Sequence, residues 1–382
     1  MASRHQSIGR SWEKLFAVAR MVLRNDLEKY PPAVLRFERD FAAYAGCQHG
    51  LSFCNGTSCL EAALFALDIQ PGDRVLVPAF TFHATITPIL NAGAEPVFID
   101  VDPGTSNVDL ADFERKARGA RAAVITHLWG NPVNMDELER ITAGLNLPLI
   151  EDCSHAHGAA WKGRRVGGFG QVGFFSLQAG KAVSAGEGGI AVTNDRSLFE
   201  RMSLFGHYDR HGSDPAWGRS GLGYKRRAHP LGLALAHVDL KHLERDNERR
   251  RALLRDFARK LPSRGFRLVF KEGDARPGGF MGKAPLVVEE GAAEPWVQGL
   301  RKQGVPASRC PYDCWHLDPV MTNLDYRRGL SRVGETGPSP AVPEDPCPSV
   351  RPFAERLFFV PLERRALGRT ARYLARPSQG KG

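Results

Sequence analysis

The alternation of short β-rich runs with helical stretches between residues 50 and 195 constrains the fold most strongly. The β-rich runs cover residues 74–78, 96–101, 122–127, 148–152, 172–176 and 189–193. Such alternation is typical of βα units and predicts an α/β protein with a mainly parallel sheet. Ligands of open α/β sheets bind beyond the carboxyl ends of the strands. We therefore expect the functional residues among the polar residues that follow these runs.

Two helical segments frame the expected domains. Residues 32–45 carry apolar side chains at helical spacing, including Val34, Phe37 and Phe41, and are predicted to pack on the sheet. Residues 243–261 predict a long charged helix that leads into a second domain. We expect a large domain over residues 1–243 and a smaller one over 244–382, with a Pro-rich loop at 334–352.

Composition and charge exclude several classes of protein. The chain is 42% apolar and 25% charged, as in globular proteins, and no apolar run approaches the roughly 20 residues of a membrane helix. Residues 1–14 are polar and lack the apolar region of a signal peptide, so we expect a cytoplasmic protein. The net charge of +10 suits an anionic substrate, but no nucleic-acid-binding module is recognisable. We expect neither a nucleic-acid nor a membrane partner.

The seven cysteines are scattered and predict reduced thiols. Cys310, Cys314 and His316 are close enough in sequence to suggest a metal site. A structural zinc site usually presents two clear ligand pairs, and this segment has no second pair. We expect no metal.

The first segment that suggests chemistry is Asn-Gly-Thr-Ser at residues 55–58, followed by an apolar helical stretch. A small hydroxyl-rich turn at a helix N-terminus offers backbone N–H groups and the positive end of the helix dipole to a phosphate. The same residues would also serve as an ordinary helix cap. Both interpretations remain open from this segment alone.

The second segment is Glu-Asp-Cys-Ser-His-Ala-His-Gly at residues 151–158. Asp152 follows a buried strand, where a carboxylate needs a cation or a strong hydrogen-bond donor. A protonated pyridine nitrogen would satisfy it, and capping of the next element is the structural alternative. His155 and His157 are equally compatible with satisfied surface histidines.

The third segment holds Lys181 in a neighbourhood rich in glycine and alanine, between an aromatic strand and a glycine turn. A desolvated lysine loses its proton more easily and can attack a carbonyl carbon. The alternative is a solvated loop lysine.

Together these segments resemble the DegT/StrS family of pyridoxal-phosphate (PLP) enzymes, the sugar and cyclitol aminotransferases of fold type I. Further matching motifs are Val-Pro-Ala-Phe-Thr-Phe at 77–82, Pro-Val-Phe-Ile-Asp-Val-Asp at 96–102, His-Leu-Trp-Gly-Asn-Pro at 127–132 and Glu-Gly-Gly at 187–189. The resemblance covers most of the first 240 residues and is loose beyond them. It implies a large domain with a mainly parallel, seven-stranded type of sheet and a smaller C-terminal α+β domain.

The resemblance also implies the roles of individual residues. Lys181 would bind the cofactor covalently and, once released, move the proton between substrate and cofactor. Asp152 would pair with the pyridine nitrogen and keep it protonated. The other implied cofactor contacts are Phe82 stacked on the ring, Gly56, Thr57, Ser58 and Ser176 at the phosphate, and His155 near the phenolic oxygen. Glu187 and the following Gly188 and Gly189 are expected to hold the lysine loop rather than to touch substrate.

The sequence departs from the family's pattern at two positions. His155 stands where many relatives have Gln; it can also donate a hydrogen bond but is expected to titrate near neutrality. Lys225 stands where many relatives have an Asn that reaches the phosphate of the neighbouring subunit's cofactor. Either Lys225 serves there as a point charge, or this contact is lost.

By resemblance, the chain would move an amino group from glutamate or glutamine to a keto sugar, nucleotide-linked, or to a keto-cyclitol in amino-sugar or antibiotic biosynthesis. Family members are homodimers with shared active sites, and residues 223–230 would be lent to the partner. Substrate contacts are expected from loops at residues 10–29 and 309–326. The alternatives are a relative of the aminohydroxybenzoate synthases and a silent PLP-binding partner or regulator. Sugar dehydratases of the family replace the lysine with histidine, so Lys181 argues against them.

Overall fold

A computed structural model describes residues 2–27, 30–207, 210, 223–262, 265–270, 273–279, 282–312, 317 and 345–375. The helices are α1 (Ala2–Leu23), α2 (Pro32–Ala45), α3 (Gly56–Ala66), α4 (Thr87–Asn91), α5 (Leu110–Lys116), α6 (Met135–Leu145), α7 (Arg196–Gly206), α8 (Pro230–Ala258), α9 (Glu294–Lys302), α12 (Val350–Arg356) and α13 (Arg364–Leu374), with 3-10 turns η1 (His83–Thr85) and η2 (Leu128–Gly130). The strands are β1 (His49–Phe53), β2 (Arg74–Pro78), β3 (Glu95–Ile99), β4 (Ala122–Thr126), β5 (Leu149–Asp152), β6 (Ala160–Trp161), β7 (Arg164–Arg165), β8 (Val172–Ser176), β9 (Gly189–Thr193), β10 (Phe266–Leu268), β11 (Ala275–Arg276), β12 (Lys283–Val288), β13 (Ser308–Arg309) and β14 (Leu357–Pro361).

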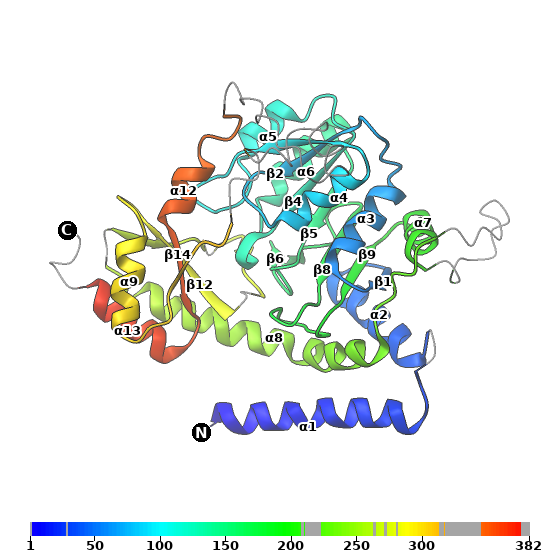
Figure 1. The fold of residues 1–382 in the computed structure, drawn as a ribbon, viewed down its shortest axis with the longest axis horizontal. Coiled ribbons are helices and arrows are strands. Elements are labelled where there is room, and N and C mark those ends of the chain that lie inside the picture. Colours follow the sequence, from blue (N-terminus) through cyan, green and yellow to red (C-terminus); the bar gives the residue numbers. More distant parts are fainter. Residues whose placement is uncertain are drawn as a thin grey trace, which may run out of the picture.

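A seven-stranded sheet in the order β1-β9-β8-β5-β4-β2-β3 forms the centre of the molecule (Figure 1). All its strands run parallel except β9, which is antiparallel to both β1 and β8. Every expected strand is present, so the predicted α/β fold with a mainly parallel sheet is confirmed. The sequence analysis missed β1, whose five residues carry no clear period and are held mainly by pairing with β9.

Helices cover both faces of this sheet. The face covered by α3 and α7 shares a core with the C-terminal part of the chain, including Phe353 and Phe359. On the other face, α2 and α8 pack against β8 and β9 through residues such as Phe37 and Leu240. The predicted helix at residues 32–45 is confirmed as α2.

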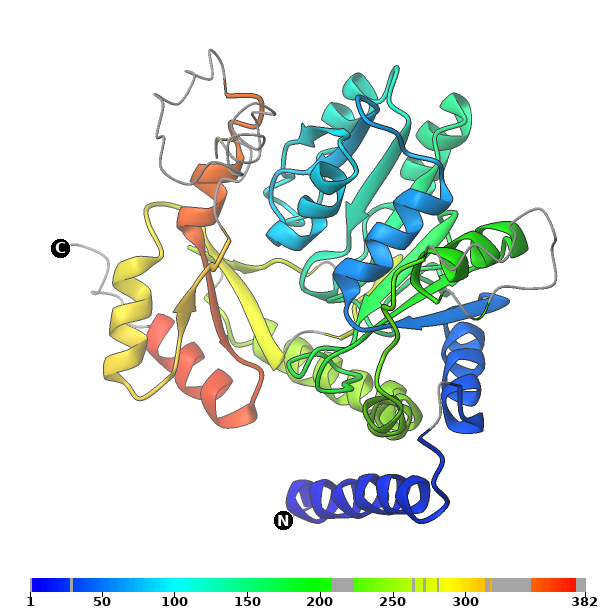
Figure 2. The same ribbon diagram turned by 45° about the vertical axis from the view of Figure 1, so that its right-hand side comes forward.

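The C-terminal part builds a second, antiparallel sheet in the order β10-β12-β14-β13, with α9 and α13 packed on it. Helix α8 runs from the large sheet to this smaller one (Figure 2). It begins well before residue 243, where the sequence analysis began it, because Pro230 occupies its first turn and His229 caps it through the amide of Leu231. We still propose the domain boundary near residues 243 and 244, now inside a continuous helix.

The structure contradicts one expected loop, at the N-terminus, and describes only part of the other, the Pro-rich segment. Residues 10–23 form the second half of helix α1 rather than a substrate-binding loop, since neither Gly nor Pro interrupts them. Of the Pro-rich segment 334–352, residues 334–344 lie outside the described residues, and Val350 already begins α12. No helix in the described ranges is long and apolar enough to cross a lipid bilayer.

Candidate active site

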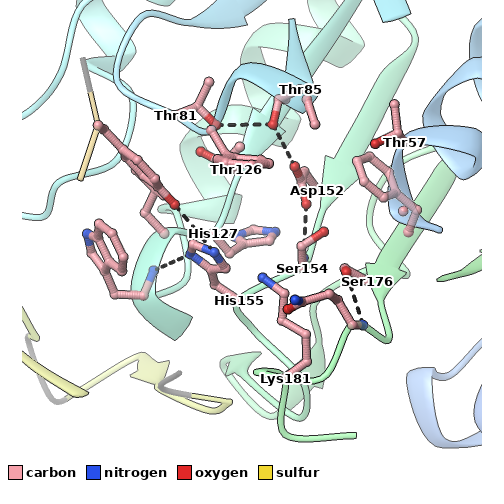
Figure 3. Close-up of a pocket in the computed structure, with 18 of the residues that line it drawn as sticks. Thr57, Thr81, Thr85, Thr126, His127, Asp152, Ser154, His155, Ser176 and Lys181 are labelled. Carbon is pink, nitrogen blue, oxygen red and sulfur yellow. Dashed lines mark hydrogen bonds between the residues drawn. The ribbon is translucent and has the colours of Figure 1, made fainter. Parts of the chain in front are cut away.

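A cavity of about 440 Å³ opens at the carboxyl ends of the central strands (Figure 3). Thr126 ends β4, Asp152 ends β5 and Ser176 ends β8, and all three line the cavity. The wall opposite the sheet comes from the second part of the chain through Tyr312 and Phe359. The cavity therefore lies where the strand pattern predicted a ligand site.

Lys181 points into this cavity from the loop between β8 and β9 (Figure 3). Burial lowers the pKa of its ammonium group from 10.5 to about 8, although the negative charge of Asp152 acts in the opposite direction. At pH 7 about a tenth of such an amine is neutral, several hundred times more than for a solvated lysine. The structure thus excludes the solvated alternative and leaves a nucleophilic amine.

Asp152 is buried at the end of β5, and both of its oxygens are held by hydrogen bonds. The amide of Ser154 donates to Oδ1 at 2.9 Å, and the hydroxyl of Thr85 donates to Oδ2 at 2.9 Å. The hydroxyl of Thr81 donates to that of Thr85 at 3.2 Å, which completes a chain of donors. The Ser154 contact stabilises a local turn and does not cap a following helix, as the structural alternative had it, because the next element after β5 is the strand β6. It leaves further lone pairs of the carboxylate for a ligand.

Sequence reasoning missed Thr85 and Thr81 as site residues. Thr81 lies inside the quoted motif at 77–82, but neither threonine carries a pattern of its own. Thr85 meets Asp152 only because η1 folds back over the ends of β2 and β5.

The N-terminus of α3 forms one end of the cavity. Asn55 caps this helix through the amide of Ser58 at 2.8 Å, so the helix-cap interpretation is correct. A Cβ on Gly56 would lie 3.2 Å from the Cβ of Ser176, so glycine lets the helix end approach β8 closely. Gly56, Thr57 and Ser176 line the cavity, as an anion cradle requires. Ser58 is fully buried behind them, and its hydroxyl accepts a hydrogen bond from Arg226 at 3.2 Å.

His155 lies under the aromatic ring of Trp129, with ring centroids 5.2 Å apart. Its Nδ1 accepts a 3.5 Å hydrogen bond from the amide of Trp129, and its Nε2 lies 3.4 Å from the hydroxyl of Tyr312. Burial, with the nearby positive charge of Lys181, holds the pKa of His155 well below 6.5. The expectation that His155 titrates near neutrality is therefore wrong, because the site desolvates it.

His157 is also buried, and burial lowers its pKa to about 3. It packs edge-on against Phe41 in the core beneath the site. The surface alternative for this pair of histidines is thus excluded.

The remaining residues predicted from sequence occupy less central positions. Phe82 lies at the rim of the cavity and is half exposed. Lys225 is exposed, bridges to the backbone of His207 and does not line the cavity of its own chain. Cys314 and His316 lie outside the described residues.

Glu187 is exposed and lines the cavity, which differs from its expected role in holding the lysine loop. Backbone hydrogen bonds hold that loop instead. The amide of Leu177 donates to the carbonyl of Gly188, and the amide of Ala185 donates to the carbonyl of Leu177, each at 2.8 Å.

His127, Glu151 and Cys153 form a buried cluster below the site with the residue types of a metal centre. The donor atoms of His127 and Glu151 are already engaged. His127 Nδ1 accepts from the amide of Val133, and its Nε2 lies 3.1 Å from Glu151. Burial would raise the pKa of Glu151, but His127 and the backbone amides that donate to it lower it overall. We interpret the cluster as structural, since its hydrogen bonds stabilise the end of β5.

The cavity fits pyridoxal phosphate on three features of its own. The glycine-lined cradle at α3 suits the phosphate, and Asp152 offers a fixed carboxylate to a ring nitrogen. Lys181 would supply the amine for covalent attachment.

A mainly parallel seven-stranded sheet with a desolvated lysine, a buried acid and an anion cradle at its strand ends is the arrangement of a PLP-dependent transferase of fold type I. The chain belongs to the DegT/DnrJ/EryC1/StrS aminotransferase family, whose model matches residues 11–333.

Known proteins resemble the chain over different lengths. It is 35% identical over 301 residues to a pleiotropic regulatory protein of Geobacillus stearothermophilus, a match that covers 78% of this chain and 79% of that protein. It is 37% identical to a dTDP-3-amino-3,6-dideoxy-alpha-D-galactopyranose transaminase of Aneurinibacillus thermoaerophilus, over 57% of this chain and 60% of that enzyme. The crystal structure of a 3-amino-5-hydroxybenzoic acid synthase matches with a TM-score of 0.82 at 26% identity, over 95% of both chains.

Proposed function

We propose that this aminotransferase moves an amino group from glutamate or glutamine to a cyclic ketone, either a nucleotide-linked keto sugar or a keto-cyclitol. The observation that carries the proposal is Lys181, an amine with a pKa of about 8 in the same cavity as Asp152 and the anion cradle. The relative from Aneurinibacillus thermoaerophilus, named as a transaminase of a dTDP sugar, supports a sugar acceptor.

Pyridoxal phosphate, when bound, would supply an aldehyde and an electron-withdrawing ring. Gly56, Thr57 and Ser176 would hold its phosphate, while Phe82 would cover the ring from the rim. Asp152, fixed by Thr85 and Ser154, would keep its negative charge directed at the ring nitrogen.

Two further side chains would handle protons and hydrogen bonds. The Nζ of Lys181, with a pKa of about 8, would take up and return a proton near physiological pH. The Nδ1 of His155 accepts from the amide of Trp129, so its proton resides on Nε2. His155 would therefore donate a hydrogen bond as the Gln of many relatives does.

The visible absorption spectrum of the purified protein with PLP tests this proposal. The parent should show a yellow band that bleaches on adding glutamate or glutamine, whereas Lys181→Ala should show no such response. A parent protein without the band, or with a band that neither donor bleaches, would contradict the proposal.

A second candidate is a PLP enzyme that forms an aminated aromatic ring. Two observations favour it. The crystal structure of the 3-amino-5-hydroxybenzoic acid synthase matches with a TM-score of 0.82, and the stacked rings of Trp129 and Tyr312 form part of the cavity wall. Parallel assays with a cyclic keto acid and a nucleotide-linked keto sugar separate the two, because only the aromatising reaction creates a new ultraviolet chromophore.

A third candidate is a silent PLP-binding regulator or partner subunit, since a relative of 35% identity is named a regulatory protein. The presence of Lys181, Asp152 and Ser176 together in one cavity supports an active enzyme instead. If an amino donor bleaches the visible band and a ketone restores it, the protein is an active enzyme and the silent role is contradicted.

We also propose a homodimer with shared active sites. Helix α1 lies beneath α8 (Figures 1 and 2) and presents exposed apolar side chains, among them Trp12, Phe16 and Leu23. Exposed apolar surface of this kind marks a protein–protein interface. We propose a second copy of this chain as the partner. Lys225 would then reach the cofactor phosphate of the partner.

A further inference from the structure

Residues 277–279, which we call the glycine strap, run between two turns of the cavity wall. On one side, the amide of Gly278 donates to the carbonyl of Gly130 at 3.0 Å. On the other side, a Cβ on Gly279 would lie 2.3 Å from the carbonyl oxygen of His155. The glycine strap leaves no room for these side chains, so it sets the distance between the two turns.

The turn that carries Trp129 is pressed against the glycine strap. Trp129 has φ +57°, in the left-handed region that non-glycine residues rarely adopt. A Cβ on the next residue, Gly130, would lie 1.8 Å from the carbonyl oxygen of Gly278 and 3.1 Å from that of His155. Strain of this kind persists only where the surrounding structure imposes it, and it clusters at functional sites. The close approach of the two turns is therefore maintained against a local preference of the backbone.

Helix α8 holds the glycine strap through buried polar side chains. Asn247 is fully buried; its Nδ2 donates to the carbonyl of His157 at 2.8 Å, and its Oδ1 accepts from the amide of Gly279 at 3.0 Å. Arg251, also buried, donates to the carbonyl of Pro277 at 2.9 Å. Asn247 therefore binds the glycine strap and the adjacent histidine turn together.

The spacing between the two turns decides which ring nitrogen of the neutral His155 carries the proton. The 3.5 Å from the amide of Trp129 to Nδ1 is at the long limit of a hydrogen bond, so a slightly wider spacing would remove it. The hydroxyl of Tyr312 lies 3.4 Å from Nε2 and competes, because a donation to Nε2 would leave the proton on Nδ1. Burial raises the pKa of Tyr312 well above 10, so this hydroxyl keeps its proton.

We propose that Asn247 is a positioning residue for His155, which acts through the glycine strap to hold the two turns together and so keeps the proton of His155 on Nε2. Use of this N–H by a cofactor rests on the proposed aminotransferase function, whereas the position of the proton does not. An amide side chain suits this role because it donates to one segment and accepts from the other at the same time.

Nitrogen-15 NMR of the cofactor-free protein, labelled in its histidines, tests the proposal. The signals of His155, identified by their loss in His155→Gln, should show the proton on Nε2 in the parent. Gly279→Ala should lower the ratio of the Nε2–H form to the Nδ1–H form about fivefold, the effect of one lost hydrogen bond. Gly291→Ala is the matched control, because Gly291 has φ +77° against +78° for Gly279 and no atom within 4 Å of its Cβ position.

Asn247→Leu is a second variant, which removes both side-chain hydrogen bonds at similar size and does not depend on the folding of Gly279→Ala. It should lower the same ratio. Leu300→Ala, at a fully buried position of α9 in the core of the smaller sheet, controls for a general loss of stability. An unchanged ratio in either strap variant would overturn the proposal, as would an equal fall in Leu300→Ala or a parent with the proton on Nδ1.

The protein loaded with PLP gives a separate readout. The pH midpoint of its visible band should shift in Asn247→Leu in the same direction as in His155→Leu, which removes the N–H altogether. A midpoint that moves in His155→Leu but not in Asn247→Leu would contradict the positioning role. A protein that binds no PLP but whose His155 proton depends on Asn247 would contradict the aminotransferase function and support the positioning role.

Discussion

At the scale of single residues, burial sets the protonation states on which the site depends. Lys181, His155 and His157 lie around the cavity and beneath it, and burial lowers the pKa of each. The first change makes an amine reactive near neutral pH, and the other two keep imidazoles neutral. One physical cause therefore produces a nucleophile at one position and fixed hydrogen-bonding groups at the others.

The pH dependence of cofactor capture follows from the pKa of Lys181. The neutral amine is the form that attacks an aldehyde, so the rate of covalent PLP attachment should rise with pH and reach half its maximum near pH 8. The measurement is borohydride trapping of the attached cofactor at short times across pH 6 to 10. A midpoint above pH 10 would show that Lys181 is solvated after all.

Thr85 should act as a positioning residue for Asp152. Thr85→Val removes the hydroxyl that donates to Oδ2, so the carboxylate can rotate away from the cofactor nitrogen. We expect PLP to bind about tenfold more weakly and its visible band to shift, since a hydrogen bond to a charged group contributes about 1.5–3 kcal/mol. Titration followed by absorbance measures both effects.

Thr85→Ser is the matched control, because it keeps the hydroxyl and should bind PLP nearly as the parent does. Equal losses in the serine and valine variants would point to packing of the threonine methyl group rather than to positioning of Asp152.

At the scale of secondary-structure elements, α1 has the reverse of the usual amphipathic arrangement. Its charged side chains face α8, where Lys14 lies 2.8 Å from Asp239 and Glu13 lies 2.8 Å from His242. Most of its large apolar side chains face away from the rest of the chain, with Phe16 at 66% exposure, and only Met21 among them is buried. A helix held to its own chain by ion pairs leaves its apolar face available to another molecule.

Substitution on the exposed face of α1 should separate the proposed dimer. Phe16→Glu places a charge in the apolar stripe, and we expect dimers to dissociate at concentrations where the parent remains associated. Sedimentation equilibrium measures the change, with Leu145→Glu, an exposed apolar position on α6, as control. A parent that sediments as a monomer and transaminates fully would refute the shared-site dimer.

At the scale of the whole molecule, the two parts of the chain share one core and close one cavity. Phe353 of α12 is fully buried and meets Phe80, just beyond β2, edge-on at 5.1 Å. Phe80 also contacts Tyr312 of the cavity wall at 5.6 Å. The C-terminal part is therefore packed onto the strand ends that carry the site.

Truncation of Phe353 should weaken this junction and the whole fold. Phe353→Ala leaves a cavity in the shared core, so we expect a loss of about 3–5 kcal/mol in the free energy of unfolding, measured by urea titration with circular dichroism. If the two parts unfolded independently, the transition of the large part would be unchanged.

Local patterns in the sequence determined most of the central sheet and the position of the site along it. Alternating β and helical runs placed most of the sheet, and the polar residues after those runs located Asp152, Ser176 and Lys181 at one edge of it. These features depend on neighbouring residues, since strand propensity and the alternation of a βα unit act over short stretches of chain.

Only the tertiary structure decided which distant segments complete the site and which protonation states its side chains adopt. Thr85 reaches Asp152 across 67 residues of sequence, and Tyr312 reaches His155 across 157. The loss of charge on His155 and the outward direction of the apolar face of α1 were likewise invisible in the sequence. Desolvation and packing arise from all the elements that meet around a side chain, and no short pattern records them.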